Sequence, residues 1–176
     1  MSSTYATYTP ASGSGRTKWT FSAWIKLSST SGSSTLFGSF TANYAFIGFR
    51  SGTLSFQETY SGSETIKYRT NRVFRDTNSW YHIVVSYNTT SGVSQSDKIK
   101  MYVNGVRETS FGFTTMPSTT DYTSYMLNTY THALGANSHT SGGSNHFDGS
   151  MSHVHLCDGY EYSPSDFGET DSTTGE

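Results

Sequence analysis

The chain has 176 residues, a length that fits one domain, and its hydrophobic content of 33%, charged content of 14% and formal net charge of −2 are all low. This balance excludes the clustered basic surface of a nucleic-acid-binding protein and the polybasic patch of a membrane-surface protein. The nearest approach to a basic cluster, Arg69, Arg72 and Arg75, is interpreted as a solvated strand edge. The chain lacks an apolar run of about 20 residues, so no membrane insertion is expected, and its start does not resemble a signal peptide.

Aromatic residues make up 15% of the chain, and they compensate for the scarcity of aliphatic side chains because each ring buries a large apolar area. The 17 glycines, the many Ser and Thr residues and the low charge favour strands joined by turns. The single cysteine, Cys157, excludes an internal disulfide framework and a Cys-rich zinc site.

Alternation of apolar and polar side chains predicts strands along the whole chain. In residues 18–26, Trp19, Phe21, Ala23 and Ile25 share one face and Trp24 lies on the other. Residues 80–87 show the strongest alternation, with His82 on the non-core face. Further strands are predicted, in chain order, from residue 36 and over residues 44–50, 53–57, 66–69, 98–103, 131–136 and 147–157.

Turn chemistry connects these strands. Asn104-Gly105 predicts a type I′ turn, because both central residues of that turn need positive φ, and residues 106–111 would return as the partner of 98–103. Ser163, Pro164 and Asp166 predict one short C-terminal helical turn. Residues 112–131 are expected to form a long loop or a pair of edge strands, and residues 137–145 a loop.

Short strands with turn signals at a spacing of about 8–12 residues, without a helical period, predict an all-β fold. Two antiparallel sheets packed as a sandwich best suit the mixture of strands with one apolar face and strands with two. We expect a single domain over residues 1–170 and a polar tail or linker at 171–176.

Several strings resemble, in the same order, strands of laminin-G-like and pentraxin-like domains: KWTFSAWIKL (18–27), WYHIVVSYN (80–88), KIKMYVNGV (98–106), ALGAN (133–137) and FDGSMSHVHL (147–156). Residues 18–169 therefore resemble the concanavalin-A-like lectin/glucanase superfamily. The ending YSPSDFGETDSTTGE also resembles tails of such domains in structural proteins of marine phages. The resemblance implies a jelly roll with ligand loops at one rim. Members mostly bind carbohydrate or protein, some bind calcium and some cleave polysaccharides. The function of this chain must therefore be argued from its site residues and not from the fold.

Enzymatic activity is not expected. A glycosidase needs two carboxylates about 5–10 Å apart across the scissile bond. The carboxylates of this chain are isolated except for Asp158 and Glu161, which fall in a predicted turn. The spacing of Tyr, His and Lys does not single out the base of a lyase.

Metal binding is left open. His153 and His155 would project to one side of a strand, with His146 nearby, but we interpret them as strand histidines beside the core. Calcium would need oxygen donors from rim loops, and the acidic clusters typical of pentraxin sites are missing. The oxygen donors that calcium (Ca²⁺) could use are Asp121, Asn137, Asn145 and Asp148.

Sugar recognition combines aromatic faces with amide and hydroxyl groups, and residues 122–130 and 137–148 supply that mixture. The candidate ligand-binding residues are Tyr122, Tyr125, Tyr130, Asn137, His139, Asn145 and Asp148. Tyr60 could join them. The alternative that these tyrosines only close the ends of the sandwich stays open.

The leading hypothesis is a non-enzymatic recognition domain that binds a glycan or a host-surface polysaccharide, carried on a larger virion or extracellular protein. The alternative is a structural or assembly domain of a phage particle or fibre that contacts neighbouring virion subunits.

Overall fold

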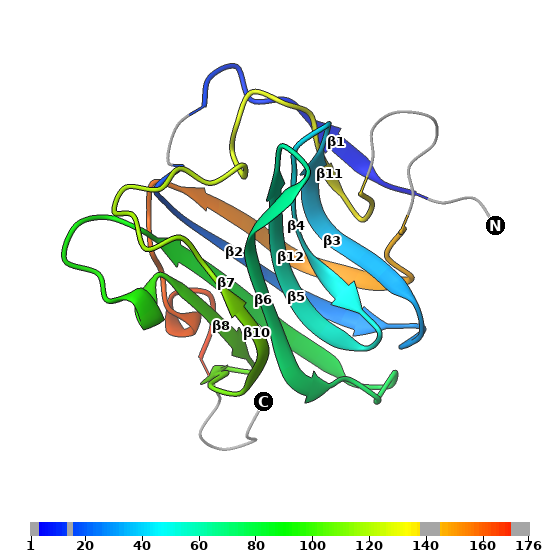
Figure 1. Ribbon diagram of the computed structural model, residues 1–176. Helices are drawn as coiled ribbons and strands as arrows, with labels where there is room; N and C mark the ends of the chain where they lie inside the picture. Colours follow the sequence, from blue (N-terminus) through cyan, green and yellow to red (C-terminus); the bar gives the residue numbers. More distant parts are fainter. Residues whose placement is uncertain (1–3, 14–15, 138–144, 170–176) are drawn as a thin grey trace.

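The computed structural model describes residues 4–13, 16–137 and 145–169, which form two antiparallel sheets packed face to face (Figure 1). One sheet has seven strands in the order β1-β11-β3-β4-β5-β6-β10, and the other has five in the order β12-β2-β7-β8-β9. The elements are β1 (Ala6–Tyr8), β2 (Lys18–Leu27), β3 (Ser33–Phe40), β4 (Tyr44–Arg50), β5 (Thr53–Tyr60), β6 (Ser63–Val73), β7 (Trp80–Asn88), η1 (Gln95–Asp97), β8 (Ile99–Val103), β9 (Val106–Arg107), β10 (Phe111–Thr115), β11 (His132–Leu134), β12 (Gly149–Asp158) and η2 (Pro164–Asp166). The predicted all-β jelly-roll sandwich is confirmed. Among the residues described, no helix has the length and apolarity to cross a membrane.

Alternate residues of the central strands fill the core between the sheets. Trp19, Phe21 and Ile25 of β2 are fully buried, as the alternation predicts. The Trp19 ring stacks on Tyr87 of β7 at a centroid distance of 5.3 Å and meets the edge of Phe56 of β5 at the same distance. The aromatic residues therefore join the two sheets, which explains how a chain with few aliphatic residues builds a core.

The predicted turns are present. Asn104 (φ 50°) and Gly105 (φ 77°) both have positive φ, which the turn between β8 and β9 requires. At η2, Ser163 and Asp166 form a reciprocal capping box, so the C-terminal helical turn predicted from these residues is confirmed.

The strand predicted over residues 106–111 is wrong in extent. Only Val106 and Arg107 pair with β8. The chain then crosses to the other sheet, where β10 pairs with β6 and Phe113 lies opposite Arg69. Buried Glu108 accepts a hydrogen bond of 2.5 Å from Arg72 Nε, which holds the crossing chain against the end of β6. Residues 112–131 thus contain one edge strand followed by a loop.

The side chain of Lys98 is buried, although the alternation over residues 98–103 predicts that it points outward with Lys100 and Tyr102. Its ammonium group donates to the carbonyl oxygens of Pro117, Ser118 and Thr119 at 3.2, 2.9 and 2.9 Å. These bonds anchor the loop that follows β10 to the start of β8.

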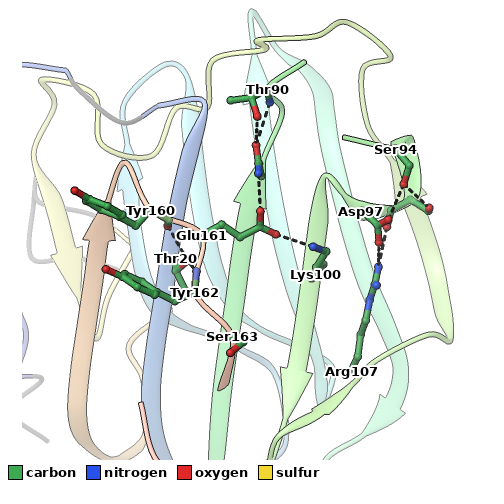
Figure 2. Close-up of polar contacts among 12 residues, drawn as sticks. Thr20, Thr90, Ser94, Asp97, Lys100, Arg107, Tyr160, Glu161, Tyr162 and Ser163 are labelled. Carbon is green, nitrogen blue, oxygen red and sulfur yellow. Dashed lines mark hydrogen bonds and ion pairs between the residues drawn. The ribbon is translucent and has the colours of Figure 1, made fainter. Parts of the chain in front are cut away.

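The C-terminal segment (residues 159–169) lies across the outer face of the five-stranded sheet. Glu161 accepts hydrogen bonds from Asn88 Nδ2 at 2.5 Å and Lys100 Nζ at 2.7 Å (Figure 2). Thr20 Oγ1 bonds to the backbone of residues 160 and 162, at 2.9 Å each. The segment is therefore fastened to three neighbouring strands, β2, β7 and β8.

Candidate ligand-binding site

The two segments that carry the predicted binding residues cover opposite ends of the sandwich. The backbone oxygen of Tyr122 accepts a hydrogen bond of 2.8 Å from Tyr87 OH, at the end of β7. The backbone oxygen of Asn145 accepts a hydrogen bond of 2.8 Å from the backbone N–H of Thr35, near the start of β3. β11, which lies between the two segments in the chain, pairs with β3 from Ser39 to Phe37 and so runs toward the start of β3. The structure therefore does not bring them together.

The predicted tyrosines close one end of the sandwich. Tyr125 lies 5.6 Å from Tyr60 between ring centroids, and Arg16 Cζ is 5.9 Å from the Tyr125 ring. Tyr122 and Tyr125 are partly buried against the core. Tyr130 is the most exposed of the three, at 43%. This packing accounts for Tyr122 and Tyr125 without a ligand.

At the other end, Asn137 is buried, whereas Asn145 and Asp148 are exposed. His139 lies outside the described residues. Asp121, the fourth donor considered for calcium, is at the opposite end, since its N–H bonds to Thr89 O at 2.7 Å. Within the described ranges, no three His, Cys, Asp or Glu side chains come together as a metal site.

His153 and His155 have different partners, because a bulge separates them. Ser152 pairs with Trp24 and His155 with Ser22, so one residue of β2 faces two of β12. His153 has positive φ (48°) and its Nδ1 lies 2.7 Å from Ser152 Oγ.

Glu58 is the carboxylic acid whose chemistry stands out. Burial raises its pKa to about 7, against the opposing effect of hydrogen bonds from Ser124 and the backbone N–H of Tyr125. Such a pKa suits a general acid. Its side chain is fully buried, however, so it cannot contact a saccharide. Glu161, which is close to Asp158 in the sequence, forms an ion pair with Lys100 and does not line an exposed site.

A groove of about 1080 Å³ opens on the outer face of the five-stranded sheet. Its floor is a single row of side chains across the sheet, formed by Ser152, Trp24, His82 and Asn104. Trp80 stands beside this row and is 42% exposed. The C-terminal segment forms one wall of the groove. The remaining lining residues are Ser79, Gly105, His153, Pro164, Ser165, Gly168 and Glu169.

Stacking and hydrogen bonds hold the side chains that form the floor of the groove. Trp24 stacks on His82 with 4.9 Å between ring centroids and 13° between ring planes. His82 Nε2 lies 2.9 Å from Ser22 Oγ, and its backbone N–H donates to Asn104 Oδ1 at 2.8 Å. Burial, and then the nearby His155, lower the pKa of His82, so this imidazole is neutral at physiological pH.

The alternation of β2 and β7 already placed Trp24 and His82 on the non-core face, and this outward aromatic pair was the signal for the groove. This pair alone does not predict a groove, because the groove also needs the C-terminal segment as a wall. Aromatic faces surrounded by hydroxyl, amide and imidazole groups are the surroundings that sugar rings prefer.

The family profile of the concanavalin A-like lectin/glucanases superfamily matches residues 1–164. The chain belongs to this superfamily. No curated protein sequence matches it significantly.

Solved structures share the fold of this superfamily domain. Domains LG4–5 of the mouse laminin α1 chain superpose with a TM-score of 0.62 and 16% identity, covering 89% of this chain and 40% of theirs. The CBM40 of the Ruminococcus gnavus IT-sialidase, bound to α2,3 sialyllactose, superposes with a TM-score of 0.64 and 11% identity. The superposition covers 85% of this chain and 80% of that one. Domain 4 of the Geobacillus stearothermophilus arabinanase AbnA, in complex with arabinotriose, superposes with a TM-score of 0.57 and 19% identity. The superposition covers 93% of this chain and 79% of that one. The chain thus spans less than half of the laminin structure, and at these identities the likeness concerns the fold alone.

Proposed function

We propose that this domain is a non-enzymatic carbohydrate-binding domain whose ligand occupies the groove on the five-stranded sheet. The observation that carries the proposal is the exposed ring of Trp80 beside the stacked Trp24–His82 floor. The groove volume suits a short oligosaccharide. Sugar C–H groups would lie against the rings, and sugar hydroxyls would bond to Asn104 and Ser152.

Two comparisons support carbohydrate as the ligand class. The CBM40 of the R. gnavus sialidase and domain 4 of AbnA have this fold and were solved with sialyllactose and arabinotriose. The first is named a CBM, whereas the second is a domain of an arabinanase, and the superfamily also contains glucanases.

The carboxylates support binding without catalysis. Of the described residues that line the groove, Glu169 is the one carboxylic acid. Glycoside hydrolysis uses a pair of carboxyl groups on the two sides of the bond. Glu58, with its raised pKa, is buried in the core and cannot supply the second.

A glycan array with neutral and acidic oligosaccharides tests the proposal, followed by titration of the best ligand with two variants. Trp80→Ala should weaken binding about tenfold or more, because it removes an exposed stacking ring from the groove. Tyr130→Ala is the matched control, since Tyr130 has nearly the same exposure but lies at the end covered by residues 116–131.

Each outcome is decisive. Loss of binding in Tyr130→Ala with wild-type binding in Trp80→Ala would move the site to the tyrosine-rich end. The absence of any bound glycan on the array would overturn carbohydrate recognition itself.

A location on a virion or another extracellular protein is a separate part of the proposal, and it is supported by the resemblance of residues 162–176 to phage-protein tails. In that setting, contacts with neighbouring virion subunits predict self-association. Sedimentation velocity over a range of concentrations tests this; a strict monomer at every concentration would contradict the assembly role.

A further inference from the structure

The outer face of the seven-stranded sheet carries two arginines that form no ion pair with a carboxylate of the described residues. Arg50 ends β4 and Arg69 lies in β6, with β5 between them. Ser55 of β5 pairs with both Gly48 and Arg69, so only small side chains separate the two cations on this face. Burial, and then the charge of Arg69, lower the pKa of Arg50 to about 10, as expected for neighbouring cations that lack a counter-ion.

Neither arginine takes part in an ion pair within the described part of the chain. The cations of the ion pairs found there are Lys67, Arg72, Lys100 and Arg107. Arg69 Nε is buried and has no hydrogen-bond acceptor among the described residues. A buried donor without an acceptor is destabilising, so Arg69 would gain an acceptor if its side chain shifted to place the guanidinium against a bound anion. β6 lies between β5 and β10, and Arg69 is only partly exposed, so the interpretation of Arg69 as part of a solvated strand edge is wrong.

Arg50 is held in place. Its Nη1 donates to the carbonyl oxygens of Ser34 at 3.1 Å and Phe49 at 2.8 Å. Its Cζ lies 3.8 Å from the centroid of the Phe46 ring, within the range of a cation–π contact. Because its position is fixed before any ligand binds, little side-chain entropy would be lost on binding.

An exposed ring adjoins the second arginine. Phe113 of β10 is 44% exposed, and Arg69 Cζ is 5.4 Å from its centroid. Lys67 Nζ is 4.3 Å from the same ring, although it also pairs with Glu64. An apolar ring beside unpaired positive charge matches a ligand with both an apolar face and an acidic group.

We propose that this arginine face, formed by Arg50, Arg69 and Phe113, binds an acidic saccharide. Its carboxylate or sulfate group meets the Arg69 guanidinium, and its sugar ring lies against Phe113. A guanidinium fork matches either anion with two parallel hydrogen bonds. Nucleic acid fits less well, because two unpaired arginines on a chain of net charge −2 do not form an extended basic surface. The arginine face is on the opposite sheet from the groove and does not depend on it.

The experiment titrates the full chain with three probes of matched length: an oligogalacturonate, a sulfated galactan oligosaccharide and a neutral galactan oligosaccharide. At least one acidic probe should bind, the neutral probe should bind about tenfold more weakly or not at all at this face, and affinity should fall as salt is raised. The acidic probe that binds identifies the anionic group as carboxylate or sulfate.

Three variants locate the binding. Arg69→Gln should weaken the acidic probe about tenfold or more, and Arg69→Lys should weaken it less, because charge remains but the fork is lost. Arg75→Gln, an exposed arginine two residues beyond β6, makes the same charge change and should bind like wild type. Arg69→Gln should cause the same loss of affinity when Trp80→Ala is also present, which separates this site from the groove.

Four results would overturn the proposal. These are failure of both acidic probes to bind, an equal loss of neutral-probe affinity in Arg69→Gln, unchanged acidic-probe affinity in Arg69→Gln, or an equal loss in Arg75→Gln. Tighter binding of an oligothymidylate than of either acidic saccharide would assign the face to nucleic acid instead. Unfolding curves of each variant show whether a loss of affinity reflects a loss of structure.

Discussion

Glu161 Oε1 lies 2.7 Å from Lys100 Nζ, so an ion pair joins the C-terminal segment to β8. Both side chains are about three-quarters buried, with exposures of 24% and 23%. Burial alone would raise the pKa of Glu161, but the hydrogen bonds from Lys100 and Asn88 outweigh it, and the pKa is lowered. The carboxylate is therefore ionised at neutral pH and holds in place the segment that forms one wall of the groove.

Glu161→Gln should release the C-terminal segment and lower the free energy of unfolding by about 1–2 kcal/mol. Because the native pKa is lowered, this contribution is present above the unfolded pKa and is lost as pH falls through the native value. Urea unfolding at pH 7 and at pH 3 measures it. Glu64→Gln breaks the more exposed pair with Lys67 and should cost about 0.5 kcal/mol or less. Equal effects of the two variants at pH 7 would contradict this role of Glu161.

Glu58 predicts a stability that falls as pH rises. Its pKa is about 7 in the native state, against 4.5 for an ordinary glutamate, so the native state binds more protons between these values. Ionisation of Glu58 should therefore remove up to about 3 kcal/mol between pH 4.5 and 7, with little change above. His132, whose pKa burial lowers to about 4, acts in the opposite direction between pH 4 and 6.5.

The measurement is the difference in unfolding free energy between wild type and Glu58→Gln at each pH, in which the contribution of His132 cancels. The variant should gain stability relative to wild type as pH rises from 4.5 to 7. A difference that does not vary with pH would show that Glu58 titrates normally.

The core could be predicted from the sequence because alternation is a local property. Trp19, Phe21 and Ile25 lie on the same face of β2 whichever strand it pairs with, and that face is buried. Asn104-Gly105 forms its turn because both residues adopt positive φ readily. The destination of β10 could not be predicted in this way. Phe113 pairs with Arg69, 44 residues earlier in the chain, and no local pattern distinguishes that partner from β8.

The groove was only half predictable for the same reason. Alternation places Trp24 and His82 on the outer face, but the wall exists because Glu161 reaches Lys100, 61 residues earlier. The predicted segments 122–130 and 137–148 look similar in composition and are close in sequence. They lie at opposite ends because the first contacts the end of β7 and the second contacts the start of β3, toward which β11 runs.

Lys98 predicts a large effect of a substitution outside the binding surfaces. Lys98→Met keeps most of the buried volume but leaves the carbonyl oxygens of Ser118 and Thr119 without their donor. Pro117 O keeps only the longer hydrogen bond of 3.3 Å from Gln95 Nε2. We expect a loss of about 2–4 kcal/mol and faster proteolysis in residues 116–131. Lys67→Met, which removes an exposed ion pair, should cost about 1 kcal/mol or less. Wild-type protease resistance in Lys98→Met would refute the anchoring role.

His153 predicts that stability and binding change in opposite directions. Its positive φ of 48° strains any residue with a Cβ and strains β-branched residues most, yet this histidine lines the groove. His153→Gly should raise the unfolding free energy by about 1 kcal/mol, and His153→Val should lower it by about the same amount or more. Because the Gly variant also loses the imidazole, it should bind the groove ligand more weakly although it is more stable. Thermal unfolding and titration of the same preparations test both halves. A Gly variant that is less stable than wild type would show that the bulge is not strained, and one that binds as tightly would remove His153 from the ligand contacts.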